Sequence, residues 1–345
     1  MNEQKTQRSW IRRHPIWSVI IALVGVLAAG LLYAWFMPFS VDAPPSDPAP
    51  TYEDAVVRIE AIQAAEDARG DVLPECRTTL MTHDDKTANV LVFMHGYTSC
   101  PEQFRQLGQE FYEKGYNVYI PRQPYHGLQE QIDNELRNLT AEDLTAYGTE
   151  SADIAQGLGE HVTVAGLSGG GTVASWLAQY RADVDVAAPI APFLGIAFIP
   201  HMLNRPFANL ADLVPSGFYM WWDPAKKADN PFSAPYSYPR YSLTSLAEVL
   251  RLAYATEEDV EHTKPASADI VVISNAADDS VNNPIVKEFI DLWEAHGADL
   301  LTTYEFEKDL DLPHDLITPD RLGNRIDLVY PVIHDLLEDA AGAGQ

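Results

Sequence analysis

The chain has 345 residues, 46% of them hydrophobic, which is enough apolar material for one large core. It carries 50 Asp and Glu against 23 Lys and Arg, a net charge of −27, so it repels nucleic-acid phosphates and no nucleic acid is expected as a partner. Two explanations of this acidity remain open. One is solubility, and the other is adaptation to salty surroundings, in which ions screen the repulsion between like charges of the protein.

Residues 1–15 form a basic tail, and residues 16–37 form an apolar stretch without charge. A helix of this length spans roughly 33 Å, enough for the hydrocarbon core of a bilayer. Because the basic residues precede the stretch, we expect a single-pass membrane anchor with the N-terminus in the cytoplasm and the remainder on the extracytoplasmic side. The alternatives are a buried core helix and a signal peptide cleaved at Val41-Asp42-Ala43.

Residues 38–50 contain five prolines, which indicates an extended linker between membrane and domain. Two cysteines follow, Cys76 and Cys100. Cys76 precedes an expected early strand, and Cys100 comes just after the loop that follows the next strand, so neighbouring strands can bring the two together. We expect a disulfide if the domain is exported, whereas a cytosolic protein would keep two free thiols.

From about residue 74, apolar runs alternate with stretches of helical spacing. The expected strands cover residues 89–95, 117–120, 161–167, 185–190, 269–274 and 300–306. The expected helices cover residues 101–114, 140–158, 169–181, 281–296 and 321–337. Apolar strands that are each followed by a helix predict an α/β fold with a mostly parallel central sheet and helices on both faces. In such sheets ligands bind at the carboxyl ends of the strands.

One segment, about residues 195–265, interrupts this alternation. It is rich in proline and in aromatic residues, namely Phe198, Phe207, Phe218, Tyr219, Trp221, Trp222, Phe232, Tyr236, Tyr238 and Tyr241. A segment this long needs its own structure or its own task in a compact domain. We expect an inserted lid over a site at the sheet edge, and the alternative is a structural insertion that packs only on the sheet.

The motif that carries chemistry is G-x-S-x-G at residues 166–170. It follows an expected strand and opens an expected helix, which is the setting of a nucleophile elbow. Gly166 and Gly170 allow the strand and helix to approach, and the tight turn exposes the Ser168 hydroxyl beside a helix N-terminus. Ser168 is therefore the candidate nucleophile. The alternative is a glycine-rich helix start without chemistry.

A serine nucleophile needs a base and an acid. In proteins with a G-x-S-x-G elbow, the acid and then the base follow the serine along the chain. His314 lies in the loop after the strand 300–306, where a base can reach the elbow, whereas the later His334 falls within the last helix. Asp278 and Asp279 both follow the strand 269–274. We prefer Asp278 as the acid, with Val281 starting the next helix and Asp279 capping it.

An oxyanion hole requires two backbone N–H groups near the nucleophile. The residue after the serine, Gly169, supplies one of them. The loop after the strand 89–95 supplies the other, and Tyr97 is the candidate. His95 supports this loop. The three carboxylates near His314 are expected in a solvated acidic loop, and they are Asp309, Asp311 and Asp315.

Together these motifs resemble the carboxylesterase and monoacylglycerol lipase branch of the α/β-hydrolase superfamily. The likeness rests on His95-Gly96-Tyr97-Thr98, Pro101-Glu102-Gln103-Phe104, Gly166-Leu167-Ser168-Gly169-Gly170, residues 278–281 and His314. The resemblance implies a catalytic triad of Ser168, His314 and Asp278. It also implies an oxyanion hole at Tyr97 and Gly169, and small-molecule esters of fatty or short acyl chains as substrates.

The likeness covers roughly residues 85–340. We expect an α/β-hydrolase domain over residues 51–340, and the resemblance implies that it cleaves carboxylic esters through an acyl-enzyme intermediate. A thioesterase, a peptidase and an acyltransferase on the same fold are alternatives, and a membrane-tethered binding module is an alternative without catalysis. No metal is expected because no His, Cys and Asp cluster has ligand spacing. No nucleotide cofactor is expected because no glycine-rich phosphate motif follows a strand.

Overall fold

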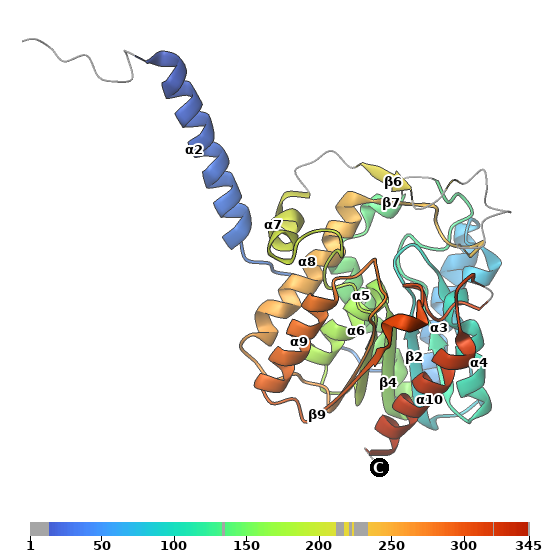
Figure 1. The fold of residues 1–345 in the computed structure, drawn as a ribbon. Coiled ribbons are helices and arrows are strands. Elements are labelled where there is room, and N and C mark those ends of the chain that lie inside the picture. Colours follow the sequence, from blue (N-terminus) through green and yellow to red (C-terminus); the bar gives the residue numbers. More distant parts are fainter. Residues whose placement is uncertain are drawn as a thin grey trace, which may run out of the picture.

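The computed structural model describes residues 14–132, 135–211, 217–220, 223, 234–319 and 321–343. Within them, seven strands form one sheet in the order β1-β3-β2-β4-β5-β8-β9 (Figure 1). The strands are β1 (Thr79–Met81), β2 (Thr87–Met94), β3 (Asn117–Ile120), β4 (Gly159–Leu167), β5 (Val186–Ile190), β8 (Asp269–Asn275) and β9 (Leu300–Phe306). All neighbouring strands run parallel except β1, which pairs antiparallel with β3 at one edge.

Apolar layers cover both faces of this sheet, because its central strands are apolar on both sides. In β2, Val90, Val92 and Met94 enter one layer. Leu91 and Phe93 enter the other. The first layer is covered by α3 (Tyr52–Arg69), α5 (Ala141–Leu158), α6 (Gly169–Tyr180), α8 (Leu243–Val260) and α9 (Asn283–Ala295). The second is covered by α4 (Arg105–Glu113) and α10 (Ile326–Ala343). The expected mostly parallel sheet with helices on both faces is confirmed.

Two helices begin later than their sequence pattern predicts. The segment 101–114 starts as the 3₁₀ turn η2 (Pro101–Phe104), because Phe104 has φ −103° and ψ 0° and interrupts the α-helical geometry before α4. The last helix begins at Ile326 rather than at Arg321, because Gly323 has φ +89° and turns the chain out of a right-handed helix.

The helix after β8 also begins later, and without the expected cap. The sequence pattern made Val281 its first residue and Asp279 its cap, and both expectations are wrong. The N-cap of α9 is Asn282, which makes no side-chain capping bond. Val281 instead pairs with Ile196 in an isolated β-bridge, so the turn after β8 is joined to the inserted segment.

Helix α2 (Pro15–Phe36) projects away from the body of the molecule (Figure 1). Its 22 residues are long and apolar enough to cross a membrane by length and composition, and a signal sequence passes the same test. Of its side chains only that of Ala34 is buried, which excludes the expected alternative of a core helix. Of the basic tail, residues 1–15, only positions 14 and 15 belong to the described residues.

The proline-rich segment after α2 contains neither helix nor strand, and it lies on the body of the protein at several points. Phe39 is buried, and its ring stacks on that of Tyr254 with 5.2 Å between the ring centroids. At the other end Ala49 is buried, and its N–H donates to the carbonyl of Asp153 at 2.9 Å. The side-chain hydroxyl of Thr145 donates to the carbonyl of Asp42 at 2.7 Å.

The inserted segment has secondary structure of its own. Its elements are α7 (His201–Ala211), β6 (Phe218–Met220), β7 (Arg240–Ser242) and α8. The strands β6 and β7 form an antiparallel pair above the carboxyl ends of the main strands (Figure 1). Three aromatic residues of the expected lid lie outside the described residues, and they are Trp221, Trp222 and Phe232. Helix α8 packs in the apolar layer with α5 and α6, so part of the insertion belongs to the core.

Helix α8 also contains a buried carboxyl group, that of Glu257. Burial, together with the carboxylates of Glu288, Glu261 and Glu258, raises the pKa of Glu257 to about 7, although Arg205 opposes the shift. Because the folded-state pKa lies above the ordinary value of 4.5, the ionised group destabilises the fold as pH rises from about 4.5 to about 7.

We therefore expect Glu257→Gln to stabilise the protein at pH 8 by about 3 kcal/mol, with the gain shrinking toward pH 5. Thermal unfolding of the detergent-solubilised chain at pH 5, 6.5 and 8 measures this difference. The exposed Glu294, on the neighbouring helix α9, provides the control Glu294→Gln, for which no such pH-dependent gain is expected. A gain that does not change with pH would contradict the assigned cause.

Cys76 and Cys100 form a disulfide, with their Cα atoms 5.2 Å apart. The bond joins the turn before β1 to the start of η2 and closes a loop with a sequence separation of 24. Thiol titration of the denatured, unreduced protein should find no free thiol, and titration after reduction should find two. The double variant Cys76→Ser and Cys100→Ser should lose about 3 kcal/mol of unfolding free energy. Two reactive thiols before reduction would contradict the bond.

Candidate active site

Ser168 occupies a strained turn between β4 and α6. Its backbone has φ 56° and ψ −115°, a conformation that non-glycine residues rarely adopt. Strand β5 and the loop after it hold the turn in place: the Ser168 N–H donates to the carbonyl of Ile190 at 3.0 Å, and the Phe193 N–H donates to the carbonyl of Ser168 at 3.0 Å. The elbow therefore rests on the ends of β4 and β5, at the carboxyl edge of the sheet.

Two glycines make this turn sterically allowed. A Cβ atom on Gly166 would lie 2.2 Å from the carbonyl oxygen of Gly170. A Cβ atom on Gly170 would lie 2.1 Å from the carbonyl oxygen of Met94, at the end of β2. Because the obstructing atoms belong to the backbone, no side-chain movement would relieve them. The glycines thus permit the close approach of α6 to the ends of β4 and β2.

His314 and Asp278 form a hydrogen-bonded pair. The His314 Nδ1 atom lies 2.6 Å from the Asp278 Oδ2 atom, and the Asp278 side chain has no exposed surface. The other carboxylate oxygen, Oδ1, accepts the N–H groups of Ser280 at 2.8 Å and Val281 at 3.1 Å. These bonds hold the carboxylate in one orientation, which in turn orients the imidazole ring.

The contact between His314 and Asp278 lowers the pKa of Asp278 and raises the pKa of His314. Burial alone would raise the pKa of Asp278, but the charge and hydrogen bond of His314 and the two N–H donors outweigh it and lower that pKa. Burial alone would lower the pKa of His314, but Asp278 outweighs it and raises that pKa. The pairing thus stabilises the imidazolium form of His314, which is the form that a general base reaches after accepting a proton.

The neighbouring aspartates have different roles from this pair. Asp279 lies at the cavity wall, and its Oδ1 atom accepts from the Ser280 hydroxyl at 3.2 Å. Asp309 and Asp311 are exposed, as expected for a solvated loop. Asp315 does not belong to such a loop: it is buried and accepts from the Thr318 hydroxyl at 2.6 Å. The expectation for Asp315 is wrong because the chain after His314 turns back into the cavity wall.

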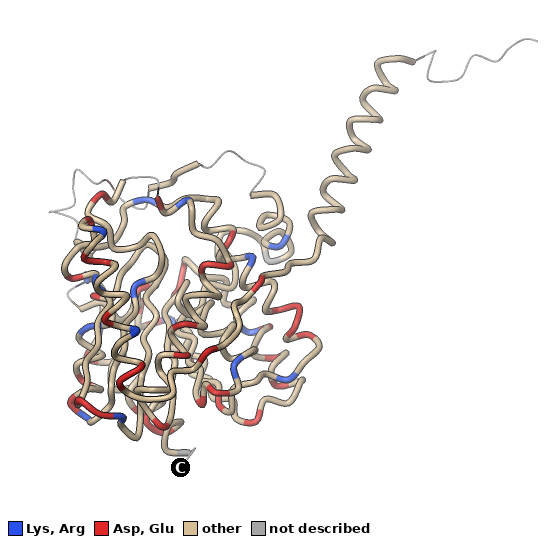
Figure 2. Tube along the Cα trace, turned by 180° about the vertical axis from the view of Figure 1, so that it is seen from behind, with Lys and Arg blue, Asp and Glu red and all other residues tan. Residues whose placement is uncertain are grey.

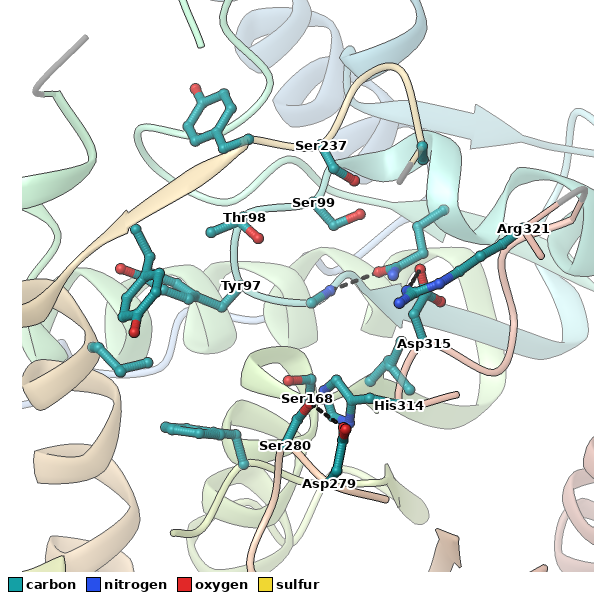
Figure 3. A pocket seen from close by; sticks show the side chains of 18 of the residues that line it. Tyr97, Thr98, Ser99, Ser168, Ser237, Asp279, Ser280, His314, Asp315 and Arg321 are labelled. Carbon is teal, nitrogen blue, oxygen red and sulfur yellow. Dashed lines mark hydrogen bonds and ion pairs between the residues drawn. The ribbon is translucent and has the colours of Figure 1, made fainter. Parts of the chain in front are cut away.

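Ser168 and His314 line the same cavity, which has a volume of about 370 Å³. Figure 3 shows their side chains next to each other, with Thr98 and Ser99 across the cavity. Apolar side chains of the inserted segment and of the loop after β5 form much of the wall, namely Phe193, Ile196, Phe198, Tyr238, Tyr241 and Leu246. The cavity therefore joins the Ser168 hydroxyl to an apolar surface.

One side of the cavity is polar. Arg321 contacts Asp315, with 3.1 Å between Nη1 and Oδ2 (Figure 3). The Arg321 Nε atom and the Ser99 hydroxyl are buried and have no hydrogen-bond partner in the part of the chain that the structure describes. Both residues line the cavity, so a polar group of a bound molecule can meet them there. The sequence pattern missed Arg321 because it assigned this residue to the last helix.

The two candidate oxyanion donors are neighbours. A Cβ atom built on Gly169 would lie 3.2 Å from the backbone nitrogen of Tyr97, so the two backbones approach closely. The preceding N–H, that of Gly96, donates to the Gln103 side chain at 2.8 Å and is thereby occupied. The Tyr97 hydroxyl donates to the Ser242 carbonyl at 3.1 Å, which ties this loop to the inserted segment. Gln103 was not anticipated as a support of the loop.

His95 lies beneath the same loop and is fully buried. Its Nε2 atom accepts the N–H of Gln123 at 3.0 Å, and the Gln123 side chain donates to the His95 carbonyl. Burial lowers the pKa of His95 well below its ordinary value, so the ring is neutral and serves as an acceptor. Among the described residues, no group of three or more His, Cys, Asp or Glu is placed to hold a metal ion.

Comparisons with known proteins are consistent with this geometry. A family model described as the alpha/beta hydrolase family matches residues 91–322. A thermostable monoacylglycerol lipase of Bacillus sp. (strain H-257) is 29% identical over 100 residues, which cover 29% of this chain and 39% of that lipase. The chain therefore matches well under half of the length of this curated relative.

Solved structures share the fold at low identity. The monoacylglycerol lipase of Paleococcus ferrophilus superposes with a TM-score of 0.57 at 15% identity, covering 76% of this chain and 98% of the lipase. A structure from work on the metagenome-derived lipolytic enzymes LipS and LipT superposes with a TM-score of 0.55 at 18% identity, covering 78% and 99% of the two chains. At such identities the likeness establishes the fold alone.

Proposed function

Because the chain belongs to the alpha/beta hydrolase family, we propose that it is a serine hydrolase that cleaves carboxylic esters through an acyl-enzyme intermediate. The observation that carries this proposal is the shared cavity of Ser168 and His314, together with the bond between His314 and Asp278. A nucleophile, a base and an orienting acid are thereby available at one point of the sheet edge.

In the proposed reaction, His314 takes the proton of the Ser168 hydroxyl as its oxygen attacks the ester carbonyl carbon. The N–H groups of Tyr97 and Gly169 stabilise the oxyanion of the tetrahedral intermediate, each worth about 3–4 kcal/mol. Asp278 keeps the His314 ring in the tautomer whose other nitrogen faces the serine, and it stabilises the imidazolium. Collapse of the intermediate breaks the ester C–O bond, and His314 donates its proton to the leaving alcohol. A water molecule, deprotonated by His314, then releases the acid from Ser168.

The cavity favours lipophilic esters, including esters of the acylglycerol type. The apolar wall of the cavity suits an acyl chain, since burial of each CH₂ group contributes about 0.8 kcal/mol. The polar side, with Ser99 and Arg321, suits a leaving alcohol that carries further oxygen atoms. The curated relative that matches part of this chain is a monoacylglycerol lipase. Its name agrees with a substrate that has an apolar acyl chain and an alcohol with further oxygen atoms.

We also propose that α2 stays in the mature protein as a membrane anchor, with the N-terminus in the cytoplasm and residues 51–340 outside as the hydrolase domain. Cleavage after Ala43 would remove Phe39, whose ring is buried against Tyr254. It would also remove the Ser40 carbonyl, which accepts from Arg251 at 2.9 Å. Because the folded domain makes these contacts and cleavage would remove them, they support an uncleaved anchor over a signal peptide.

The proposal is tested by a fluorophosphonate probe together with matched oxyester, thioester and amide substrates. We expect the probe to label the full chain at Ser168, and oxyesters to be cleaved faster than the thioesters and amides of the same acyl chain. A preference for thioesters or amides would instead identify a thioesterase or a peptidase. Ester formation with an added alcohol would identify an acyltransferase. A folded chain that neither labels nor turns over any ester would leave only a binding module.

A further inference from the structure

The end of α2 is bonded to the inserted segment through helix α7. The Asn209 side chain on α7 donates to the Ala34 carbonyl at 2.7 Å and to the Met37 carbonyl at 3.3 Å. Ala34 is the buried residue of α2, and it belongs to the apolar stretch rather than to the linker. Figure 1 shows α7 beside the body-proximal end of α2. Helix α7 therefore lies level with the last turn of the proposed membrane span.

Arg205 joins α7 to the linker and to α8. Its guanidinium forms an ion pair with Glu258 on α8, and it lies 4.9 Å from the centre of the Phe39 ring. The same Glu258 carboxylate accepts the backbone N–H of Phe39 at 3.1 Å. Three segments thus meet at one point: α7, the chain leaving α2, and the helix that packs on the core. This contact fixes the position of α7 relative to both the anchor and the domain.

Helix α7 and the residues before it expose large apolar side chains. The exposed fractions are 78% for Phe198, 64% for Met202 and 46% for Leu203. These three residues are called the α7 apolar face here. Phe198 also lines the cavity that contains Ser168, so this face adjoins the cavity wall. Solvent is a poor environment for such a cluster, and apolar clusters of this kind are typical of contact surfaces.

We propose that the α7 apolar face inserts into the interface of the same lipid bilayer that α2 spans, so that the cavity takes its ester substrate directly from the membrane. The inference rests on the proposed anchor and extends the proposed function. The carbonyl of Ala34 lies within the apolar stretch, so an element bonded to it is at the level of the lipid headgroups. Apolar side chains at that level enter the region between headgroups and acyl chains.

Charge disfavours a membrane contact that is made by ion pairs with anionic headgroups. The chain has a net charge of −27, and Figure 2 shows Asp and Glu distributed over the body, whereas α2 carries no charged residue. A body so acidic is repelled by anionic headgroups, so contact with a membrane has to come from apolar side chains. The α7 apolar face provides such side chains next to the anchor.

A fluorescence measurement on the full chain in proteoliposomes tests the insertion itself. The native cysteines are joined in a disulfide, so a cysteine introduced by Met202→Cys can be labelled alone with an environment-sensitive dye. The matched control is Leu300→Cys, because Leu300 is 48% exposed and is the first residue of β9, at the amino ends of the parallel strands, whereas the cavity lies at their carboxyl ends. We expect a blue shift and quenching by brominated lipids at position 202 only. Equal spectra and equal quenching at the two positions would overturn the proposal.

A kinetic measurement tests the consequence for substrate entry. The double variant Met202→Asp and Leu203→Asp should cleave a long-chain ester embedded in vesicles about tenfold or more slowly than the native chain. Its rate with a short, water-soluble ester should not change, which also verifies that it is folded, and Leu300→Asp should leave both rates unchanged. An unchanged vesicle rate would overturn substrate uptake from the membrane. Loss of all ester cleavage in the native chain would contradict the proposed function instead, while the fluorescence result would still decide the insertion.

Discussion

Replacing Ser168 with Ala is expected to lower the rate of p-nitrophenyl ester hydrolysis by a factor on the order of 10⁴–10⁶, without unfolding the protein. In the proposed mechanism the Ser168 hydroxyl attacks the ester carbonyl, so its removal eliminates the proposed covalent route. The fold should persist because backbone hydrogen bonds to Ile190, at the end of β5, and to Phe193, in the loop after it, hold the backbone of Ser168. The elbow glycines are also unchanged. Fluorophosphonate labelling should disappear together with the hydrolysis.

The matched control for this variant is Ser280→Ala. Ser280 lines the same cavity, but its hydroxyl bonds to Asp279 and not to His314 or Asp278. Its loss should leave labelling intact and change the rate by less than about tenfold. A folded Ser168→Ala variant with native activity would show that another residue is the nucleophile. Equal losses in both variants would show that the substitutions disturb the cavity rather than the chemistry.

Asp278→Asn should lower kcat by about 10³–10⁴-fold, whereas Asp279→Asn should have a small effect. The amide preserves the size of the side chain but donates a hydrogen to His314 Nδ1, which selects the wrong imidazole tautomer. Asp279 is the matched control, because it is adjacent in sequence and lies at the same cavity, but its carboxylate bonds to the Ser280 hydroxyl and not to His314. A larger loss in Asp279→Asn than in Asp278→Asn would contradict the assignment of the acid.

The pH dependence of the same variants separates a catalytic role from a structural one. His314 accepts a proton only when it is neutral, so kcat/KM should fall as pH drops through the pKa of His314 in the free enzyme. Asp278 raises that pKa above the ordinary value of 6.5. Removing the carboxylate charge should therefore move the acidic limb of the profile to lower pH. A residual activity in Asp278→Asn with an unshifted acidic limb would show that Asp278 does not act through His314.

Features that depend on neighbours in the sequence were anticipated well. The strands β3 and β9 have the expected bounds, because each is a short apolar or β-branched run ended by a turn. Helix α5 begins with a capping box, in which Thr140 and Asp143 bond reciprocally across three positions of the sequence. The turn at Ser168 also follows from local sequence, because the glycines on either side permit the backbone conformation that the structure has.

Several features that depend on distant segments were not anticipated. Asp315 is adjacent to His314 in sequence, but its burial depends on Thr318 and on Arg321 after the chain has turned back. Val281 was expected to start a helix, but it forms a β-bridge with Ile196, which lies at the start of the inserted segment. The same holds for Arg205, whose partners Glu258 and Phe39 lie far away along the chain. Neither apolar periodicity nor a local motif predicts contacts between residues that lie far apart along the chain.

The amino-acid sequence by itself determined the layered sheet, the elbow at Ser168, the chain order of the candidate residues Ser168, Asp278 and His314, and the apolar N-terminal helix. These features follow from apolar periodicity, steric limits on glycine and helix length, all of which act over a few residues. Only the tertiary structure decided that Asp278 rather than Asp279 contacts His314, because adjacent side chains leave a turn in different directions. It also decided that α7 meets α2, because that contact joins residues about 175 positions apart, whose encounter depends on the packing of every element between them.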